Sequence, residues 1–159
     1  MLILKLLLLL VVANGAPIIA KNVFGRRFAF PVDGYVSLAD GQRLFGPTKT
    51  IRGILLSVVA TLVCASLLGL DWHIGLIIGS AAMLGDLCSS FIKRRVKKPP
   101  TSMALGVDQI PESLFPMLAC KHLLSLSLLD IVSVVVAFFI VELLLSRLLY
   151  KLHIRDKPY

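Results

Sequence analysis

The sequence predicts an all-α integral membrane protein, in which about five transmembrane helices form a bundle with two basic cytoplasmic loops. Hydrophobic residues make up 57% of the 159 residues, which is too apolar for a water-soluble globule. Charged residues make up only 16%, against about 25% in a typical soluble domain, and they cluster between long uncharged runs. These observations exclude a soluble domain, a disordered chain and a β-barrel of short alternating strands.

Five apolar segments are long enough for helices that cross a bilayer, which takes about 20 residues. The predicted spans are residues 1–20, 53–70, 74–92, 111–129 and 131–150, within one membrane-embedded domain that covers 1–159. As a single helix, the apolar stretch after residue 110 would be about 60 Å long, twice the hydrocarbon thickness. We therefore expect it to fold back, with the turn at Asp130. The first segment has a second interpretation, a signal peptide cleaved near Ala16, but the apolar segments that follow favour a span.

Basic residues fall into three clusters, after the first, third and fifth predicted spans. The clusters contain 15 of the 17 Lys and Arg residues: Lys21, Arg26, Arg27, Arg43, Lys49 and Arg52, then Lys93, Arg94, Arg95, Lys97 and Lys98, then Arg147, Lys151, Arg155 and Lys157. Five spans place all three clusters on one face, which the positive-inside rule makes cytoplasmic. We therefore expect a multi-pass protein of the cell membrane, with the N-terminus outside and the C-terminus and active site facing the cytoplasm.

The composition also limits partners and chemistry. The formal charge of +8 indicates anionic partners in a membrane protein, either membrane lipids or nucleotide phosphates. We expect no nucleic-acid partner, because the chain has no room for an aqueous domain. The three cysteines, Cys64, Cys88 and Cys120, lie in apolar runs without metal-ligand spacing, so we interpret them as small buried residues. The sequence leaves the oligomeric state unknown.

The end of the third predicted span carries a polar helix face. At about 100° per residue, five polar side chains fall within an arc of roughly 140°: Asp86, Ser89, Ser90, Lys93 and Arg94. A carboxylate at the membrane boundary is costly unless it meets a cation, water or a polar cavity, so Asp86 is a candidate functional residue. The alternative is that Asp86 only pairs with Lys93 or a neighbouring lysine and so holds helices together.

The loop after the first span carries a second polar group, between Asp40 and Gly53. Its small residues would let backbone amides approach an anion closely. Four side chains in it could donate hydrogen bonds to phosphate oxygens: Thr48, Lys49, Thr50 and Arg52. The glycine-lysine spacing of a P-loop is absent, and the alternative interpretation is a basic loop that rests on anionic lipid.

Two acidic residues, Asp108 and Glu112, stand at the entrance to the fourth predicted span. Together with Asp86 they could hold Mg²⁺, which prefers carboxylates, water and substrate phosphates. Alternatively both are ordinary acids at a helix start, an interpretation that Pro111 supports. In the first span, Asn14 is followed by a glycine and a proline, so this site either lines a cavity or marks a kink.

Taken together, these segments resemble the CDP-archaeol synthase family, relatives of the phosphatidate cytidylyltransferases (CDP-diacylglycerol synthases), over nearly the whole chain. Five groups of residues carry the resemblance: Asn14 with Ala16-Pro17; Asp40-Gly41-Gln42-Arg43; Phe45 to Thr50 with Arg52-Gly53; Gly85-Asp86 with Ser90 and Lys93-Arg94-Arg95; and Asp108-Gln109 with the closing Ile154 to Tyr159. Two positions depart from the family pattern. Ile51 replaces an aromatic residue, and Pro111-Glu112 stands where a second aspartate is usual, with Glu112 as the candidate substitute.

The resemblance implies a CTP-dependent cytidylyltransferase of phospholipid biosynthesis. In that reaction a lipid phosphate attacks the α-phosphorus of CTP, which expels pyrophosphate and leaves a CDP-activated lipid, with Mg²⁺ as cofactor. Under this resemblance we assign three roles: Asp86 and Asp108, with Glu112, to Mg²⁺; Lys49, Arg52, Lys93 and Arg94 to phosphates; and Asn14, Thr48, Thr50 and Ser90 to polar support. Asp86, Lys93 and Asp108 are the candidate catalytic residues. The acceptor stays open between phosphatidic acid and an archaeal-type ether lipid phosphate.

The residue types in these segments fit the physical requirements of this reaction. A phosphate monoester has a second pKa near 6, so it needs no general base at neutral pH. Cations and positioning must instead relieve the repulsion between two polyanions. A CDP-alcohol phosphotransferase is a weaker match, because no further aspartates follow Asp40-Gly41-Gln42-Arg43 between Phe45 and Arg52. A non-enzymatic membrane scaffold or anionic-lipid-binding protein is the other alternative, but it would leave the polar face at Asp86 unexplained.

Overall fold

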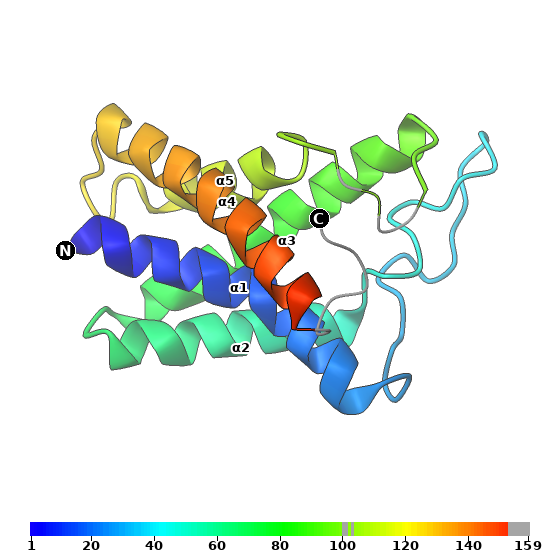
Figure 1. Cartoon of the computed structure of the whole chain (residues 1–159), viewed down its shortest axis with the longest axis horizontal. Coiled ribbons are helices and arrows are strands. Elements are labelled where there is room, and N and C mark those ends of the chain that lie inside the picture. The colour runs from blue at the N-terminus through cyan, green and yellow to red at the C-terminus, as the bar shows by residue number, and fades with distance from the viewer. Residues whose placement is uncertain (100–101, 103, 153–159) are drawn as a thin grey trace.

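The part of the chain that the structure describes is a bundle of five helices. The computed structural model describes residues 1–99, 102 and 104–152, and all regular secondary structure in this part of the chain is helical. The helices are α1 (Leu2–Phe24), α2 (Ile51–Leu67), α3 (Trp72–Arg95), α4 (Gln109–Cys120) and α5 (Leu128–Lys151). Helix α3 packs against α2 and α4, α1 packs against α2, and α5 contacts α1 and α4 (Figure 1). The prediction of an all-α membrane bundle is confirmed.

The helices differ in how far they could reach across a bilayer. Within the described residues, α1, α3 and the Leu128–Leu148 part of α5 are long and apolar enough to cross, and α2 is apolar but shorter. Helix α4 has only 12 residues, or about 18 Å at 1.5 Å per residue. The predicted span over 111–129 is therefore wrong in extent, because its helix ends at Cys120.

The fold-back before α5 does not occur at Asp130 as predicted. The chain leaves α4 after Cys120, and α5 begins beyond Ser127. Ser127 and Asp130 form a capping box: the Asp130 amide donates to Ser127 Oγ at 3.1 Å, and the Ser127 amide donates to Asp130 Oδ2 at 3.0 Å. An acidic residue in the first turn satisfies free backbone amides and favours a helix start, which is why Asp130 begins α5 instead of interrupting it.

Helix α1 continues through the polar Asn14 site. Pro17 lies inside the helix and has no amide hydrogen, so the Ala13 carbonyl four residues earlier loses its helical partner. Ser57 of α2 replaces that partner, because its hydroxyl donates to Ala13 O at 2.6 Å in a buried position. The proline therefore fixes α1 against α2 at this level, while Asn14 donates to Leu10 O at 3.0 Å.

Glycines let α3 approach its neighbours closely. A Cβ at Gly75 would lie 2.6 Å from the backbone of Leu62 in α2, and one at Gly79 would lie 3.0 Å from Val58 Cα. Near the other end of α3, a Cβ at Gly85 would lie 2.8 Å from the amide nitrogen of Glu112 in α4. These close contacts fix the position of the residues that follow Gly85.

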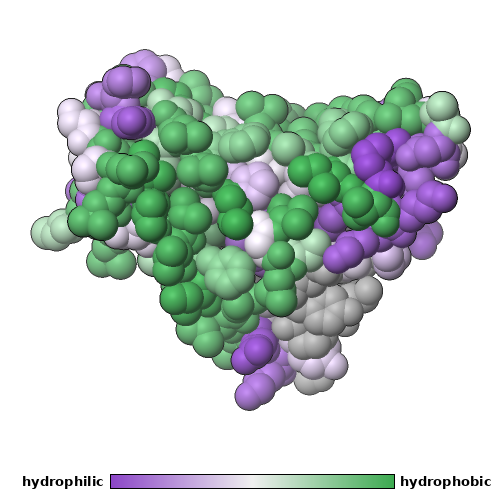
Figure 2. Space-filling model, turned by 90° about the horizontal axis from the view of Figure 1, so that it is seen from above, coloured by the Kyte–Doolittle hydropathy of each residue, from purple (hydrophilic) through white to green (hydrophobic). Residues whose placement is uncertain are grey.

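The connections between the helices lie at the two ends of the bundle. Figure 1 shows the N-terminus, the α2–α3 link and the 121–127 connection at one end, with loop 25–50 and the C-terminal end of α3 at the other. Figure 2 shows an apolar surface over the helices, with a large group of hydrophilic side chains at the loop end and smaller hydrophilic groups elsewhere, one of them at the opposite end. The first two basic clusters thus share one end of the bundle. Residues 153–159, with Arg155 and Lys157, lie outside the described residues.

Candidate active site

A cavity of about 480 Å³ lies where the loop end of the bundle meets loop 25–50. All five helices contribute to its wall. Every residue that the sequence proposed for the site lines it: Asn14, Thr48, Lys49, Thr50, Arg52, Asp86, Ser90, Lys93, Arg94, Asp108 and Glu112. The cavity therefore joins polar groups from the two basic loops to apolar side chains of the membrane helices, such as Val11, Phe138 and Leu145.

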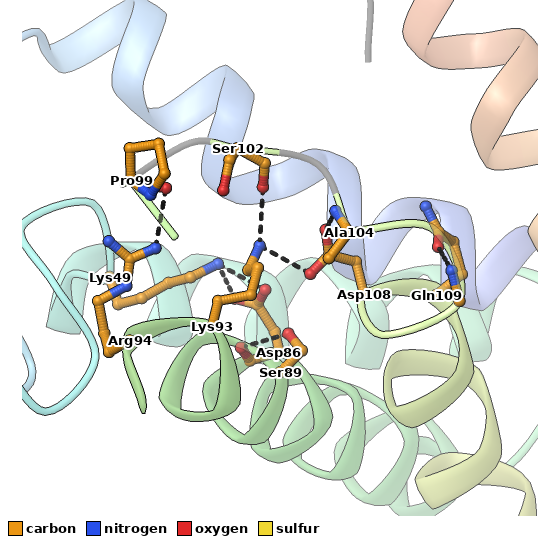
Figure 3. A network of polar contacts seen from close by, with 11 residues as sticks. Lys49, Asp86, Ser89, Lys93, Arg94, Pro99, Ser102, Ala104, Asp108 and Gln109 are labelled. Carbon is orange, nitrogen blue, oxygen red and sulfur yellow. Dashed lines mark hydrogen bonds and ion pairs between the residues drawn. The ribbon is translucent and has the colours of Figure 1, made fainter. Parts of the chain in front are cut away.

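Lys49 of the first loop reaches across to Asp86 of α3. Its ammonium contacts both carboxylate oxygens, with Nζ 2.5 Å from Oδ1 and 2.6 Å from Oδ2 (Figure 3). Both side chains are largely withdrawn from solvent. Burial lowers the pKa of Lys49, but the carboxylates of Asp86, Glu112 and Asp108 outweigh burial and raise it. Lys49 therefore stays protonated and links the loop to the helix.

A second ion pair connects α3 to the start of α4. Lys93 Nζ lies 2.7 Å from Asp108 Oδ1 and donates to Ser102 O at 3.2 Å (Figure 3). The other carboxylate oxygen, Asp108 Oδ2, accepts the Ala104 amide at 3.0 Å. This hydrogen bond holds Ala104 in place near the end of the connection between α3 and α4. Asp86 thus pairs with the first loop and not with Lys93, so the two lysines serve two different carboxylates.

Arg94 is a buried cation in the same wall. Its side chain is 4% exposed, and Nη2 donates to Pro99 O at 3.0 Å, whereas Nε has no hydrogen-bond partner. In the described part of the chain no carboxylate forms an ion pair with it. Gly46 of the first loop lies over the guanidinium stem, where a Cβ at Gly46 would be 3.7 Å from Arg94 Cδ. Such a guanidinium favours an anion, since its charge is not neutralised locally.

Asp86 and Glu112 bring two carboxyl groups together from different helices. The close packing of Gly85 against Glu112 N brings the two helices together at this level, so the two carboxyl groups lie close enough to interact electrostatically. Glu112 is 6% exposed. Carboxylates are the ligands that Mg²⁺ prefers, so the chemistry of this pair fits a divalent cation. Among the residues that the structure describes, no three His, Cys, Asp or Glu side chains are already arranged around a common metal position.

Two of the proposed polar residues also have structural roles. Thr50 caps α2, since its hydroxyl accepts the Gly53 amide at 3.2 Å. Arg52 donates to Gly25 O at 3.3 Å and also to Arg27 O, so it holds the end of α1. Ser90 is buried at the cavity wall, and neighbouring Ser89 lies outside it and donates to Asp86 O at 2.9 Å.

Sequence reasoning missed three residues at or beside the site. Glu142 of α5 and Gln109 of α4 line the cavity, and Gln109 accepts the Gly106 amide at 2.9 Å. Asp33 lies within the first loop, outside the cavity lining, and is buried. Burial alone would raise the pKa of Asp33, but hydrogen bonds from Arg43 and from backbone amides lower it to about 2. Glu142 is the single acidic residue of α5 beyond Asp130 in its first turn, and this was the available signal for it.

These features define a polytopic membrane protein whose cavity is equipped for anionic, phosphate-bearing ligands. The family model for CarS-like CDP-archaeol synthases matches residues 68–159. The CDP-archaeol synthase of Sulfurisphaera tokodaii is 33% identical over 154 residues, covering 93% of this chain and 89% of that relative. The CDP-archaeol synthase of Pyrobaculum aerophilum is 26% identical over 153 residues, covering 93% and 92%. The chain therefore belongs to the CDP-archaeol synthase family.

A solved structure agrees with this assignment. An intramembrane enzyme for archaeal membrane lipids biosynthesis matches with a TM-score of 0.67 at 27% identity, covering 87% of this chain and 90% of that one. The resemblance noted in the sequence is confirmed, and the protein is a transferase of membrane-lipid biosynthesis. Its family makes a non-enzymatic scaffold the weaker interpretation. The closing Ile154 to Tyr159 motif lies outside the described residues.

Proposed function

We propose that this protein transfers CMP from CTP to an archaeal-type ether lipid phosphate, forming a CDP-activated lipid and pyrophosphate. The observation that carries the proposal is the convergence of Lys49 with Asp86 and of Lys93 with Asp108 in one cavity walled by membrane helices. Two substrates that both carry phosphates need cations, and one of them needs an apolar wall for its chains. The relatives are named CDP-archaeol synthases, and archaeol is an ether lipid, so we propose an ether lipid phosphate as the acceptor.

The reaction requires little covalent help from the protein. An oxygen of the lipid phosphate attacks the α-phosphorus of CTP, a new P–O bond forms, and the bond to the β-phosphate breaks with release of pyrophosphate. Because the attacking group is already an anion at neutral pH, positioning and charge relief are the main requirements. The buried guanidinium of Arg94 supports an assignment to CTP phosphates, since it has no local carboxylate partner in the described residues.

The two lysine–carboxylate pairs suggest an exchange of partners on binding. When phosphates enter, the ammonium groups of Lys49 and Lys93 can turn to phosphate oxygens, and the released carboxylates can turn to a divalent cation. Both lysines then act as phosphate ligands, and Asp86 with Asp108 provides negative charge for the cation. Such charge-assisted contacts are about twice as strong as neutral hydrogen bonds.

We assign Mg²⁺ to Asp86 and Glu112, with Asp108 as a further candidate ligand. The cation is typically held by one or two carboxylates together with water and substrate phosphates. When bound, it would neutralise phosphate charge and favour departure of pyrophosphate. The electrostatic coupling of the Asp86 and Glu112 carboxyl groups supports this assignment, because two neighbouring acids favour a shared cation or proton.

We place the loop end of the bundle in the cytoplasm, where CTP is available. The positive-inside rule supports this orientation, since basic clusters follow α1 and α3 at that end. The N-terminus then lies outside. A test is cysteine labelling in intact cells, in which a cysteine introduced at the exposed Lys98 should resist a membrane-impermeant thiol reagent until the membrane is opened.

The decisive assay follows two labels of CTP. Purified protein in nanodiscs receives either α-³²P- or γ-³²P-labelled CTP with an ether lipid phosphate or phosphatidic acid. We expect the α label in the lipid fraction and the γ label in pyrophosphate, with the ether acceptor preferred. No lipid label with any acceptor would overturn cytidylyl transfer. Label from the γ-phosphate in the lipid would indicate a kinase, and a preference for phosphatidic acid would overturn only the acceptor assignment.

A further inference from the structure

Asp33 is an unusually buried acid in an exposed loop. Its side chain is 0% exposed, although much of the loop after α1 is exposed. It does not line the cavity. No sequence motif indicated a role for Asp33, and neither the ion pairs nor the carboxyl pair of the site include it.

Both carboxylate oxygens of Asp33 are engaged. Oδ1 forms an ion pair with Arg43 Nη2 and accepts the Tyr35 amide at 3.2 Å. Oδ2 accepts Arg43 Nε at 3.2 Å, the Phe45 amide at 3.3 Å and the Gly46 amide at 3.0 Å. With these partners the carboxylate has little capacity left for a metal or substrate, so its role must be indirect.

The amides that Asp33 holds begin the segment that carries Lys49. Beyond Gly46, the chain passes through Pro47 and Thr48 at the cavity wall. The far end of the segment is also fixed, because the Val32 amide donates to Lys49 O at 2.9 Å and the Ile51 amide donates to Phe30 O at 3.0 Å. Asp33 follows directly after Val32, so the residues around it hold both ends of the same short loop.

The partner of Asp33 is in turn attached to α3. Arg95 Nη2 donates to Arg43 O at 2.8 Å, and Arg95 Nη1 pairs with Asp40 at 2.7 Å. Arg95 also lies over the Phe91 ring, with 5.2 Å from its guanidinium carbon to the ring centroid. The loop is therefore anchored on the helix that supplies Asp86 and Lys93.

We propose that Asp33, through Arg43 and the amides of Phe45 and Gly46, is the positioning residue that sets the place of Lys49 in the active site. This proposal rests on the proposed function. Loss of the carboxylate leaves the Arg43 guanidinium and three backbone amides, those of Tyr35, Phe45 and Gly46, without their charged acceptor. The 45–49 segment then shifts, and Lys49 no longer meets Asp86 and the nucleotide in the same geometry. Asp33 itself touches neither substrate.

The test compares Asp33→Asn with Asp71→Asn, an equal change of charge in the exposed link at the opposite end of the bundle. For Asp33→Asn we expect kcat/KM for CTP to fall at least about 10-fold, as expected for loss of charged hydrogen bonds. The KM for the lipid phosphate should stay within about twofold, since the change acts through Lys49 and not through the helices. Asp71→Asn should match wild type.

A second measurement separates positioning from general loop stability. CTP affinity is measured for wild type, Asp33→Asn, Lys49→Gln and the double variant. If Asp33 acts through Lys49, Asp33→Asn will cost little further affinity in the Lys49→Gln background. Equal fold-losses in both backgrounds, or wild-type kcat/KM for Asp33→Asn, would overturn the proposal.

If Asp33→Asn does not fold, the Arg43→Lys variant tests the proposal instead. It keeps the cation but loses the paired contacts of Arg43 to Asp33. It should show the same selective loss in kcat/KM for CTP, and wild-type kinetics would overturn the proposal. Failure of the proposed function looks different. In that case wild-type protein itself would transfer no cytidylyl group.

Discussion

Gly85 of α3 lies directly against Glu112 of α4: a Cβ at position 85 would fall 2.8 Å from the Glu112 amide nitrogen, and closer still to the Pro111 carbonyl. The contact is between backbones, so it cannot be relieved by a side-chain rotation. It sets the distance between two helices at the level where Asp86 and Glu112 meet. The glycine beside the aspartate is therefore part of the site geometry.

Gly85→Ala is expected to push α4 away from α3 and to separate Glu112 from Asp86. Overpacking of this kind costs about 1–3 kcal/mol of stability, and we expect CMP transfer to fall at least about 10-fold as the site opens. Thermal unfolding and initial rates measure both effects. Leu84→Ala, on the exposed side of the same helix, is the control and should retain activity. A fully active Gly85→Ala protein would contradict the role of this contact.

Asp86→Asn is expected to abolish turnover while the protein still inserts and folds. The amide keeps the shape of the side chain and an acceptor for Lys49, but it removes the charge assigned to Mg²⁺. A loss of about 1,000-fold or more in kcat corresponds to about 4 kcal/mol of transition-state stabilisation. Initial rates over a range of Mg²⁺ concentrations check it. Wild-type-like rates in a well-folded Asp86→Asn protein would defeat the metal assignment.

Lys93→Ala is expected to weaken CTP binding about 10- to 100-fold, which is the range for loss of a charge-assisted hydrogen bond in a poorly solvated cavity. The exposed Lys98→Ala in the following turn removes the same charge outside the cavity and serves as the control. Equilibrium binding of CTP distinguishes the two variants. If the affinity of Lys93→Ala for CTP were unchanged, the role of Lys93 would be limited to its structural ion pair with Asp108.

The stability contributed by Asp33 should depend on pH only under acidic conditions. The pKa of Asp33 is lowered from 3.8 to about 2 in the folded protein. Its contribution is therefore fully present above pH 3.8 and is lost as the pH falls towards 2, and it amounts to at most about 2 kcal/mol. Unfolding of wild type and Asp33→Asn should differ by a constant amount from pH 5 to 8. The difference should shrink below pH 4, and a constant difference down to pH 2 would contradict this account.

Ser127→Ala should destabilise α5 without changing catalysis. It removes the hydroxyl that accepts the Asp130 amide, and loss of such a cap costs about 1 kcal/mol. We expect a lower unfolding temperature and an unchanged KM for CTP. Ser66→Ala, an exposed serine near the end of α2, is the matched control and should unfold as wild type does. A selective change in KM would show that the start of α5 is coupled to the site.

Much of the fold was predictable because the signals are local. Long apolar runs predict α1, α3 and α5 directly, since each helix satisfies its own backbone hydrogen bonds. The turn before α5 was placed wrongly because residues 121–127 contain no Gly or Pro to mark it, and the capping box of Ser127 and Asp130 was not recognised. The site residues were found as groups at helix ends, but their pairing was not.

The sequence by itself determined the membrane helices, the basic clusters and the set of carboxylates, lysines and arginines available for a phosphate site, because composition and helical period depend on neighbouring residues. Only the tertiary structure decided that Lys49 meets Asp86, that Lys93 meets Asp108 and that Glu142 enters the cavity from α5. Those relationships join residues far apart in the chain. They depend on how closely the helices pack at Gly75, Gly79 and Gly85, and no local pattern encodes that distance.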